Sequence, residues 1–291
     1  MNGLVFGRLQ KNNLMLKNSE LFPEYARIKE FFKKEFGLVL PDKLNAANSK
    51  RLENFIEVSG GLNGSLKLSQ HKNHVPDEKL LGLISLFTVN HTSFFREKKQ
   101  FQFFKEKVMP NVLGPNFEDE KSDLRVWSAA AASGEEPYSI LLTMLDYFHE
   151  NDCEYKGSIL ATDIDIEALN IGYHGSYRQN KIEGKISALN KRYFQKQTNG
   201  NLQISADLRR QVLFRWLNLN SEQYPMKRKF HAIFCRNVML YLSKESREKI
   251  IRNLTEYLLP GGYLFLGISE TNLVQRSDMR SLGDSIYQKE Y

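Results

Sequence analysis

The stretch from Val126 to Ile140 combines residue types that could hold a small charged ligand. It reads VWSAAAASGEEPYSI, so that an apolar run passes into tiny residues and then into two carboxylates. Tiny side chains let a ligand approach the main chain closely, and Gly134 adds freedom of φ. Glu135 and Glu136 would repel a phosphate, and no P-loop lysine follows them. The pattern favours a cationic ligand, with an ordinary packed turn between a strand and a helix as the alternative.

Asp163 follows directly after a second apolar segment, within the sequence ATDID. A carboxylate at the end of a strand can accept hydrogen bonds from both hydroxyl groups of a ribose, as in dinucleotide-binding folds. Asp165 is predicted to cap the next helix, and the two aspartates lack the further ligands that a metal site requires. A cationic ligand that carries a ribose indicates S-adenosylmethionine, whose sulfonium and ammonium groups are both positive.

Strand-like segments alternate with helix-like segments from residue 123 onward. Segments typical of strands fall at 124–128, 158–162, 212–217, 232–235 and 263–266, and helical patterns fall at 136–149, 166–173 and 244–258. The last helix is predicted to lead into a turn at residues 260–262. This alternation predicts a parallel sheet with helices on both faces. Ligands of such sheets bind beyond the carboxyl ends of the strands, where both motifs fall.

The N-terminal region has a different pattern. Apolar residues at helical spacing begin near residues 23, 46 and 77 and predict three helices. We therefore expect an all-α N-terminal domain over residues 1–85, followed by a second domain over residues 86–291.

A hairpin is expected within the second domain. Asn199-Gly200 stands between two apolar segments, which is a strong signal for a tight turn between antiparallel strands. We predict a small antiparallel β subdomain at about residues 190–211. A hairpin without a function of its own is the alternative.

Composition narrows the class of protein. The 291 residues are 41% hydrophobic and 26% charged, which is ordinary for a globular chain. The longest apolar run is too short to span a bilayer and no secretory signal pattern is present, so we expect a soluble cytoplasmic protein without membrane insertion. Cys153 and Cys235 are the only cysteines, and neither a disulfide framework nor a metal is expected. The formal net charge of +7 favours an acidic partner without choosing between nucleic acid, anionic lipid and protein.

Five motifs together resemble a known family. They are NHTSFFR at 90–96, WSAAAASGEEPYS at 127–139, ATDID at 161–165, Asn218-Leu219, and CRNVMLY at 235–241. In this combination they are similar to the chemotaxis-receptor glutamate O-methyltransferases, the CheR family, and the resemblance covers nearly the whole chain. Ala132-Ser133 departs from the family pattern, which has a Ser-Thr pair there. The resemblance implies an α/β fold: a doubly wound, Rossmann-like S-adenosylmethionine-dependent methyltransferase domain with a small antiparallel β subdomain, preceded by an all-α N-terminal domain.

The resemblance also implies roles for individual residues. The residues implied to bind S-adenosylmethionine are Asn90, Thr92, Arg96, Glu135, Asp163, Asn218, Leu219, Cys235 and Arg236. Glu135 would take the ammonium group and Asp163 would hold the ribose. Asn218 and Leu219 would bracket the adenine. Arg96 and Tyr241 would be the catalytic residues, which orient the incoming carboxylate, and no metal is implied.

The implied reaction transfers a methyl group to glutamate side-chain carboxylates of methyl-accepting chemotaxis receptors. Its products would be glutamate methyl esters and S-adenosylhomocysteine. The cytoplasmic helical domain of a receptor would approach a basic face that includes Lys33, Lys34 and Lys43. A receptor C-terminal tail could add a strand to the β subdomain.

Two other interpretations stay open. A nucleic-acid methyltransferase would explain the basic net charge. However, the Asn/Asp-Pro-Pro-aromatic segment of amino-methylating enzymes is absent, and Asn237-Val238-Met239 stands in the comparable place, so no nucleic-acid partner is expected. A non-catalytic S-adenosylmethionine-binding signalling module would keep the cofactor site without turnover, which the presence of Arg96 and Tyr241 argues against.

Overall fold

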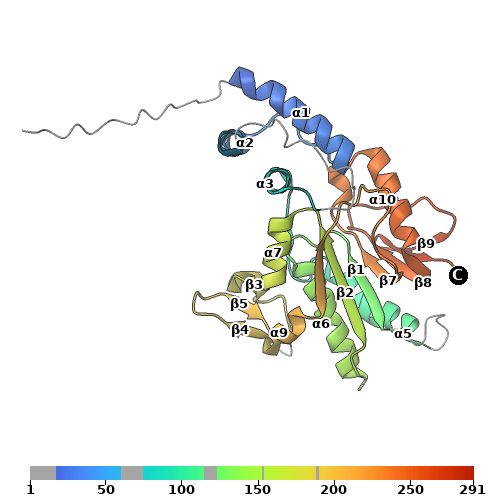
Figure 1. Ribbon diagram of the computed structural model, residues 1–291. Helices are drawn as coiled ribbons and strands as arrows, with labels where there is room; N and C mark the ends of the chain where they lie inside the picture. Colours follow the sequence, from blue (N-terminus) through green and yellow to red (C-terminus); the bar gives the residue numbers. More distant parts are fainter. Residues whose placement is uncertain (1–17, 60–74, 115–122, 153, 188–189) are drawn as a thin grey trace, which may run out of the picture.

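A seven-stranded sheet forms the centre of the fold (Figure 1). The computed structural model describes residues 18–59, 75–114, 123–152, 154–187 and 190–291. The strands lie in the order β6-β2-β1-β7-β8-β10-β9. Their bounds are β1 Leu124–Ser128, β2 Gly157–Asp163, β6 Val212–Trp216, β7 Phe230–Phe234, β8 Leu258–Phe265, β9 Met279–Gly283 and β10 Ile286–Lys289. The first five in this order are parallel neighbours, which confirms the doubly wound sheet.

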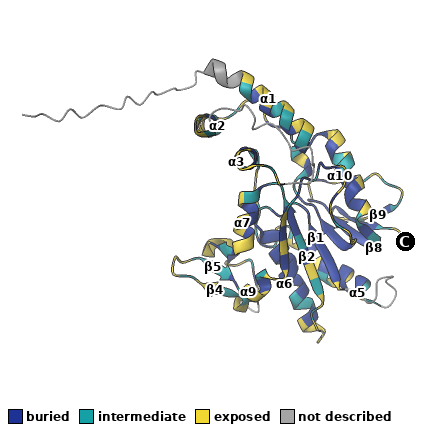
Figure 2. Cartoon of the chain, viewed as in Figure 1, coloured by how far each residue is buried: buried dark blue, intermediate teal, exposed yellow. Residues whose placement is uncertain are grey.

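Successive residues of the central strands face two different cores. Val126 and Phe234 pack with α6 (Glu135–Glu150) and α7 (Ile166–His174), and Trp127 and Ile233 pack with α10 (Lys244–Glu256). The first face is also covered by α4 (Lys98–Phe103), the π-helix η1 (Phe104–Val108) and α5 (Met109–Val112). Because side chains alternate along a strand and both faces are covered, every residue of β1 is buried, as Figure 2 shows for the central strands.

Three N-terminal helices enclose a separate core. They are α1 (Asn18–Phe36), α2 (Ala46–Ser59) and α3 (Glu78–Phe87), as the sequence predicted, although α1 begins before Pro23. Ile28, Phe32, Leu52 and Leu83 are buried between them. In none of the described ranges is a helix long and apolar enough to cross a membrane.

The C-terminal edge of the sheet differs from the prediction in two ways. Residues 260–262, expected as a turn, lie inside β8, and α10 ends before them at Glu256. The pairing register between β7 and β8 shifts between Phe230 and Ala232, which absorbs the irregular Pro-Gly-Gly sequence. In addition, β9 and β10 form an antiparallel pair at this edge, so the expectation of a wholly parallel sheet is wrong here.

A small antiparallel sheet lies apart from the central one (Figure 1). Its strands are β3 (Ser176–Tyr177), β5 (Leu202–Ile204) and β4 (Phe194–Lys196), in that spatial order. Short helical segments accompany them: α8 (Gln179–Ile182), η2 (Asn190–Tyr193) and α9 (Ala206–Arg209). Gly200 takes φ of +82° between β4 and β5, as the Asn-Gly signal predicted. β3 lies upstream of the range 190–211 in which the sequence located this sheet.

One buried carboxylate connects the N-terminal helices to the central sheet. Asp165 is 1% exposed and caps α7 by accepting hydrogen bonds from the N–H groups of residues 167 and 168. Its oxygens also accept from the Ser85 hydroxyl at 2.6 Å, the Thr88 hydroxyl at 2.5 Å and the Asn90 amide at 2.6 Å. Burial acts to raise the pKa of Asp165, but these side-chain hydrogen bonds outweigh it and hold the pKa below its usual value.

Replacing this carboxylate should destabilise the protein. Asp165→Asn presents an amide group to several hydrogen-bond donors, so we expect the free energy of unfolding to fall by about 2–4 kcal/mol at pH 7 in urea titrations. A carboxyl group whose folded pKa is lowered stabilises the fold above its unfolded pKa, and this contribution is lost as the pH falls through the folded value. The gap between the two proteins should therefore shrink below about pH 4. Glu167→Gln, at an exposed position of the same helix turn, is the control, and equal stability of the two variants would contradict this account.

Candidate active site

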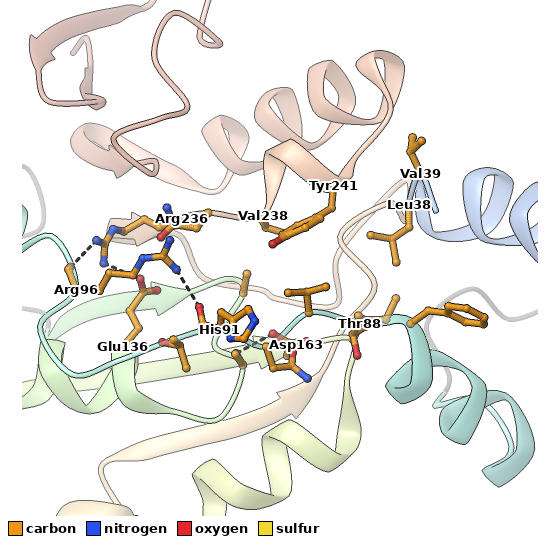
Figure 3. Close-up of a pocket in the computed structure, with 18 of the residues that line it drawn as sticks. Leu38, Val39, Thr88, His91, Arg96, Glu136, Asp163, Arg236, Val238 and Tyr241 are labelled. Carbon is orange, nitrogen blue, oxygen red and sulfur yellow. Dashed lines mark hydrogen bonds and ion pairs between the residues drawn. The ribbon is translucent and has the colours of Figure 1, made fainter. Parts of the chain in front are cut away.

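A cavity of about 360 Å³ lies at the carboxyl ends of β1, β2 and β7 (Figure 3). It is lined by residues in the segments 38–41 after α1, 87–96 after α3, 130–136 after β1, 163–164 at the end of β2, and 236–241 after β7. A smaller hollow of about 60 Å³ adjoins it and shares Leu38, Asp163 and Val238 as lining residues. The larger volume is within the range of small-molecule sites.

Most of the predicted site residues surround these two hollows. Asn90, Thr92, Arg96, Asp163, Arg236 and Tyr241 line the larger one, and Asn218 and Leu219 line the smaller. Glu135 and Cys235 line neither. Asn90 has a second role in the structure, because its side-chain amide is bound to Asp165.

Cys235 is enclosed in the core on the α10 side of the sheet. It is fully buried, and burial raises the pKa of its thiol well above the usual value. The thiol therefore stays protonated at neutral pH and cannot serve as a nucleophile. Cys153 lies outside the described residues.

Asp163 is held rigidly at the edge of the cavity. One carboxylate oxygen accepts from the N–H of Ala132 at 2.8 Å, and the other accepts from the N–H of Asp165 at 2.9 Å. Burial is the main cause that raises the pKa of Asp163 to about 6. Each carboxylate oxygen can accept a second hydrogen bond, so the side chain can still bind two hydroxyl groups that enter the cavity.

The tiny residues after β1 serve two different purposes. Ala130 and Ala132 line the cavity, which matches the predicted close approach of a ligand. Gly134 does not line it and is required by packing, since a Cβ there would lie 2.7 Å from the Cα of Gly172 and 2.8 Å from the Tyr177 hydroxyl. Its φ of +92° also favours glycine.

The two glutamates that begin α6 lie in different surroundings. Glu135 is fully buried, and its carboxylate accepts from the Ser133 hydroxyl and from the Lys181 ammonium group, each at 2.6 Å. Glu136 is the one that lines the cavity. Its carboxylate accepts from the Ser128 hydroxyl at 2.8 Å and from the Arg236 guanidinium at 2.9 Å, while burial raises its pKa. The sequence analysis named Glu135 for the ammonium group of the cofactor, and that role stays a prediction.

Arg236 joins two carboxylates at the polar end of the cavity. Its side chain is 1% exposed and forms ion pairs with Glu136 at 2.9 Å and with Glu97 at 2.7 Å. Burial acts to raise the pKa of Glu97, but hydrogen bonding to Arg236 outweighs it and the pKa is lowered. Arg236 also donates to the carbonyl oxygen of Arg96 at 2.6 Å, which fixes the main chain there. The guanidinium of Arg96 itself is exposed and donates to the carbonyl of His91, as the dashed line in Figure 3 shows.

Tyr241 lies across the cavity from Asp163 (Figure 3). It ends the short 3-10 helix η3 (Met239–Tyr241). Its carbonyl oxygen accepts from the N–H of Val39 at 2.8 Å, and Leu38 forms an isolated antiparallel bridge with Leu242. The N-terminal region thus supplies one wall of the cavity and is clamped to the loop that carries Tyr241.

A buried carboxylate that the sequence analysis missed supports this loop from behind. Glu270 is 4% exposed and accepts from the backbone N–H groups of Asn237 at 2.9 Å, Met239 at 2.7 Å and Gly267 at 2.7 Å. Asn237 is held in the left-handed region, with φ of +58°. Glu270 therefore sets the path of the segment that carries Arg236, Val238 and Tyr241.

Several contributors to the site carry no local signal in the sequence. Glu97 and Glu270 are 139 and 33 residues distant from the partners they hold. Leu38 and Val39 belong to the N-terminal region, which the sequence did not assign to the cavity. Glu136 could have been found, since it adjoins Glu135 in the same motif. In the part of the chain that the structure describes, no cluster of His, Cys, Asp and Glu could hold a metal ion.

Weakening the support by Glu270 should loosen the loop. In Glu270→Gln an amide group faces three N–H donors, so we expect the amide hydrogens of residues 236–241 to exchange at least about tenfold faster, in line with the loss of a charged hydrogen bond. Hydrogen-exchange mass spectrometry of the peptide that covers this loop is the measurement. Glu248→Gln, at an exposed position of α10, is the control. Unchanged protection in Glu270→Gln would show that the carboxylate does not hold the loop.

Comparison with known proteins agrees with this geometry. Residues 90–286 match the family model for the CheR methyltransferase, SAM binding domain. A chemotaxis protein methyltransferase of Borreliella burgdorferi is 34% identical over 248 residues, which are 85% of this chain and 88% of the relative.

Further relatives cover similar shares of the chain. A chemotaxis protein methyltransferase of Salmonella typhimurium is 32% identical over 268 residues, 90% of this chain and 88% of that protein. A probable chemotaxis protein methyltransferase of Rhizobium etli is 37% identical over 191 residues, 65% of this chain and 70% of that protein. With the matching motifs gathered around one cavity, these similarities lead to one conclusion: the chain belongs to the CheR methyltransferase family.

Proposed function

We propose that this chain transfers the methyl group of S-adenosylmethionine to glutamate side chains of chemotaxis receptors, with glutamate methyl ester and S-adenosylhomocysteine as products. The proposal rests on the cavity at the carboxyl edge of the sheet. Asp163, Arg236 and Tyr241 line this cavity, and the chain belongs to the CheR family. The names of the relatives, chemotaxis protein methyltransferases, support the receptor as the substrate.

The hydrogen-bond acceptors and apolar walls of the cavity suit S-adenosylmethionine. Asp163 has acceptor positions left for the two ribose hydroxyl groups, and the carboxylate of Glu136 can accept from the ammonium group in place of the buried Glu135. The smaller hollow, lined by Asn218 and Leu219, adjoins the larger cavity and would receive one edge of the adenine, with the rest of the ring in the larger cavity. When bound, the cofactor supplies a methyl group made electrophilic by the sulfonium.

The residues of this chain need not remove a proton from the acceptor. A glutamate has an unperturbed pKa of about 4.3 and is ionised at neutral pH. Ester formation neutralises a carboxylate and a sulfonium, so strong stabilisation of the separated charges would slow the step. The main contribution of the site is then orientation and exclusion of water, which can lower a barrier by on the order of 7–11 kcal/mol. Arg96 and Tyr241 would orient the incoming carboxylate.

Receptor binding would involve surfaces beyond the cavity. Lys33 and Lys34 in the last turn of α1, together with Lys43, are exposed and could steer an acidic receptor helix in the cytoplasm. β4 is an edge strand of the small sheet and could accept a receptor tail by strand addition. An unchanged KM for a receptor that lacks its tail would rule this tether out.

The function is tested by labelled methyl transfer to receptor-containing membranes. Wild-type protein with tritiated S-adenosylmethionine should label the receptor, and mild base should release the label, because esters hydrolyse readily. In Tyr241→Phe we expect kcat to fall by about tenfold to a hundredfold, the effect of one hydrogen bond to a charged group. Tyr173→Phe, at an exposed position of α7, should behave as wild type.

Other outcomes of this assay would contradict the proposal. Base-stable label, or label on nucleic acid, would indicate a different acceptor. Cofactor binding without label on any receptor would favour a non-catalytic binding module. A wild-type rate in Tyr241→Phe would show that the Tyr241 hydroxyl group takes no part in the reaction.

Cofactor affinity should fall in mild acid. Asp163 must be ionised to accept two hydroxyl groups, and with a pKa of about 6 it becomes protonated as the pH drops below that value. We expect the calorimetric Kd for S-adenosylhomocysteine to rise toward tenfold for each pH unit below about 6. Glu136, which also lines the cavity beside Arg236, has a raised pKa and faces the same ligand.

The variant Asp163→Asn separates these two carboxylates. It should bind more weakly at pH 7.5 and show a flat profile between pH 7.5 and 5. A slope that persists in the variant would assign the titration to Glu136. Equal wild-type affinity at pH 7.5 and pH 5 would contradict the role of an ionised Asp163.

A further inference from the structure

The two ends of the cavity differ in chemistry. Glu136, Arg236 and the exposed Arg96 lie at one end in Figure 3, and Leu38, Val39 and Thr88 lie at the other. The second end is built by the segments that follow α1 and α3. Its lining side chains include Val39, Pro41, Phe87 and Val89, which we call the apolar rim.

The apolar rim is open to solvent although it lines a cavity. Val39 is 54% exposed and Val89 is 49% exposed, and Pro41 is exposed as well. Isolated exposed apolar residues are ordinary on protein surfaces, but a group around one opening indicates a binding surface. In the proposed placement, Asp163 and Glu136 match the polar groups of the cofactor and the side of the smaller hollow matches its adenine, so no part of the cofactor is assigned to the exposed valines.

The position of the rim beside Tyr241 points to the second substrate. The main chain of Val39 is hydrogen-bonded to that of Tyr241, so this part of the rim adjoins the residue proposed to orient the acceptor. A glutamate side chain is short, and the backbone that carries it must come to the mouth of the cavity. If that backbone is helical, the residues three and four positions away lie about 5–6 Å from the acceptor on the same face. These are the residues that reach the rim.

We infer that the apolar rim is the docking surface for apolar side chains one helical turn from the acceptor glutamate of the receptor. This inference rests on the proposed function and extends it, because it makes Val39 and Val89 determinants of which glutamates are methylated. A glutamate flanked at these positions by charged residues is a poor substrate, and one flanked by apolar residues is a good one.

Paired substitutions test the inference. In the double variant Val39→Ser and Val89→Ser, the KM for receptor membranes should rise by about tenfold or more, since the apolar contacts of two side chains with the receptor are lost while no charge is introduced. The kcat and the calorimetric Kd for S-adenosylhomocysteine should stay within about twofold of wild type, because neither valine side chain is assigned a cofactor contact and Val39 supports the cavity wall through its main chain, which the substitution keeps. Ile171→Ser on α7, at a position 49% exposed, is the matched control and should leave all three values unchanged.

A receptor-side substitution supplies the second half of the test. Changing the apolar residue one turn from a methylated glutamate to Ser should raise the KM of the wild-type enzyme, and the effect should be smaller with the Ser variants, since the contact is already lost. Such non-additivity identifies direct contact.

Three results would overturn the inference while leaving the proposed function intact. One is a wild-type KM in the double variant. Another is a loss of S-adenosylhomocysteine binding, which would assign the valines to the cofactor site. The third is a wild-type protein that sediments as a dimer and a double variant that sediments as a monomer, each without receptor, which would make the rim a contact between copies of this chain. Failure of the wild-type protein to label any receptor would instead refute the proposed function itself.

Discussion

The site depends on charged side chains that are buried and must therefore be paired within the protein. Arg236, Asp165 and Glu270 are each at most 5% exposed, and each is bound by several partners from distant segments. An unpaired charge at such depth would cost several kcal/mol, so each pairing constrains the segments that it joins. Asp165 holds the end of α3 against α7, Arg236 holds the 90–97 segment against α6, and Glu270 holds the loop after β7. The cavity is the space that these connections leave open.

This arrangement explains why the N-terminal helices and the sheet share one site. Leu38 and Val39 form part of the cavity wall through main-chain contacts with residues 241 and 242, and Asn218 donates to the carbonyl of Glu35 at 2.9 Å. A cofactor held at the sheet would therefore be enclosed by the region proposed to face the receptor. For a reaction in which two opposite charges are neutralised, such enclosure removes water and aligns the reactants, and it requires no proton acceptor.

The sequence predicted the parts of the fold that depend on local patterns. The five parallel strands and the helices between them follow from apolar periodicity, and the Asn199-Gly200 turn follows from the φ that its glycine must adopt. The β9–β10 hairpin was missed because its strands have no strong alternation of apolar residues, and residues 260–262 were misread because a bulge accommodates them within β8. For the site, motifs located Asp163, Arg96, Arg236 and Tyr241 at the cavity. They did not show that Glu136 lines the cavity and Glu135 does not, because adjacent residues of a helix face different directions. Nor could they reveal Glu97 or Glu270, whose partners are distant in sequence.

The measurement that tests the central claim most directly is a calorimetric titration of the wild-type protein with S-adenosylhomocysteine at neutral pH. The account predicts binding of one molecule per chain, with a negative heat-capacity change from burial of the adenine between the two hollows. Absence of binding to the folded protein would contradict it, because the assigned roles of Asp163, Glu136 and the enclosing N-terminal wall all depend on a cofactor in this cavity.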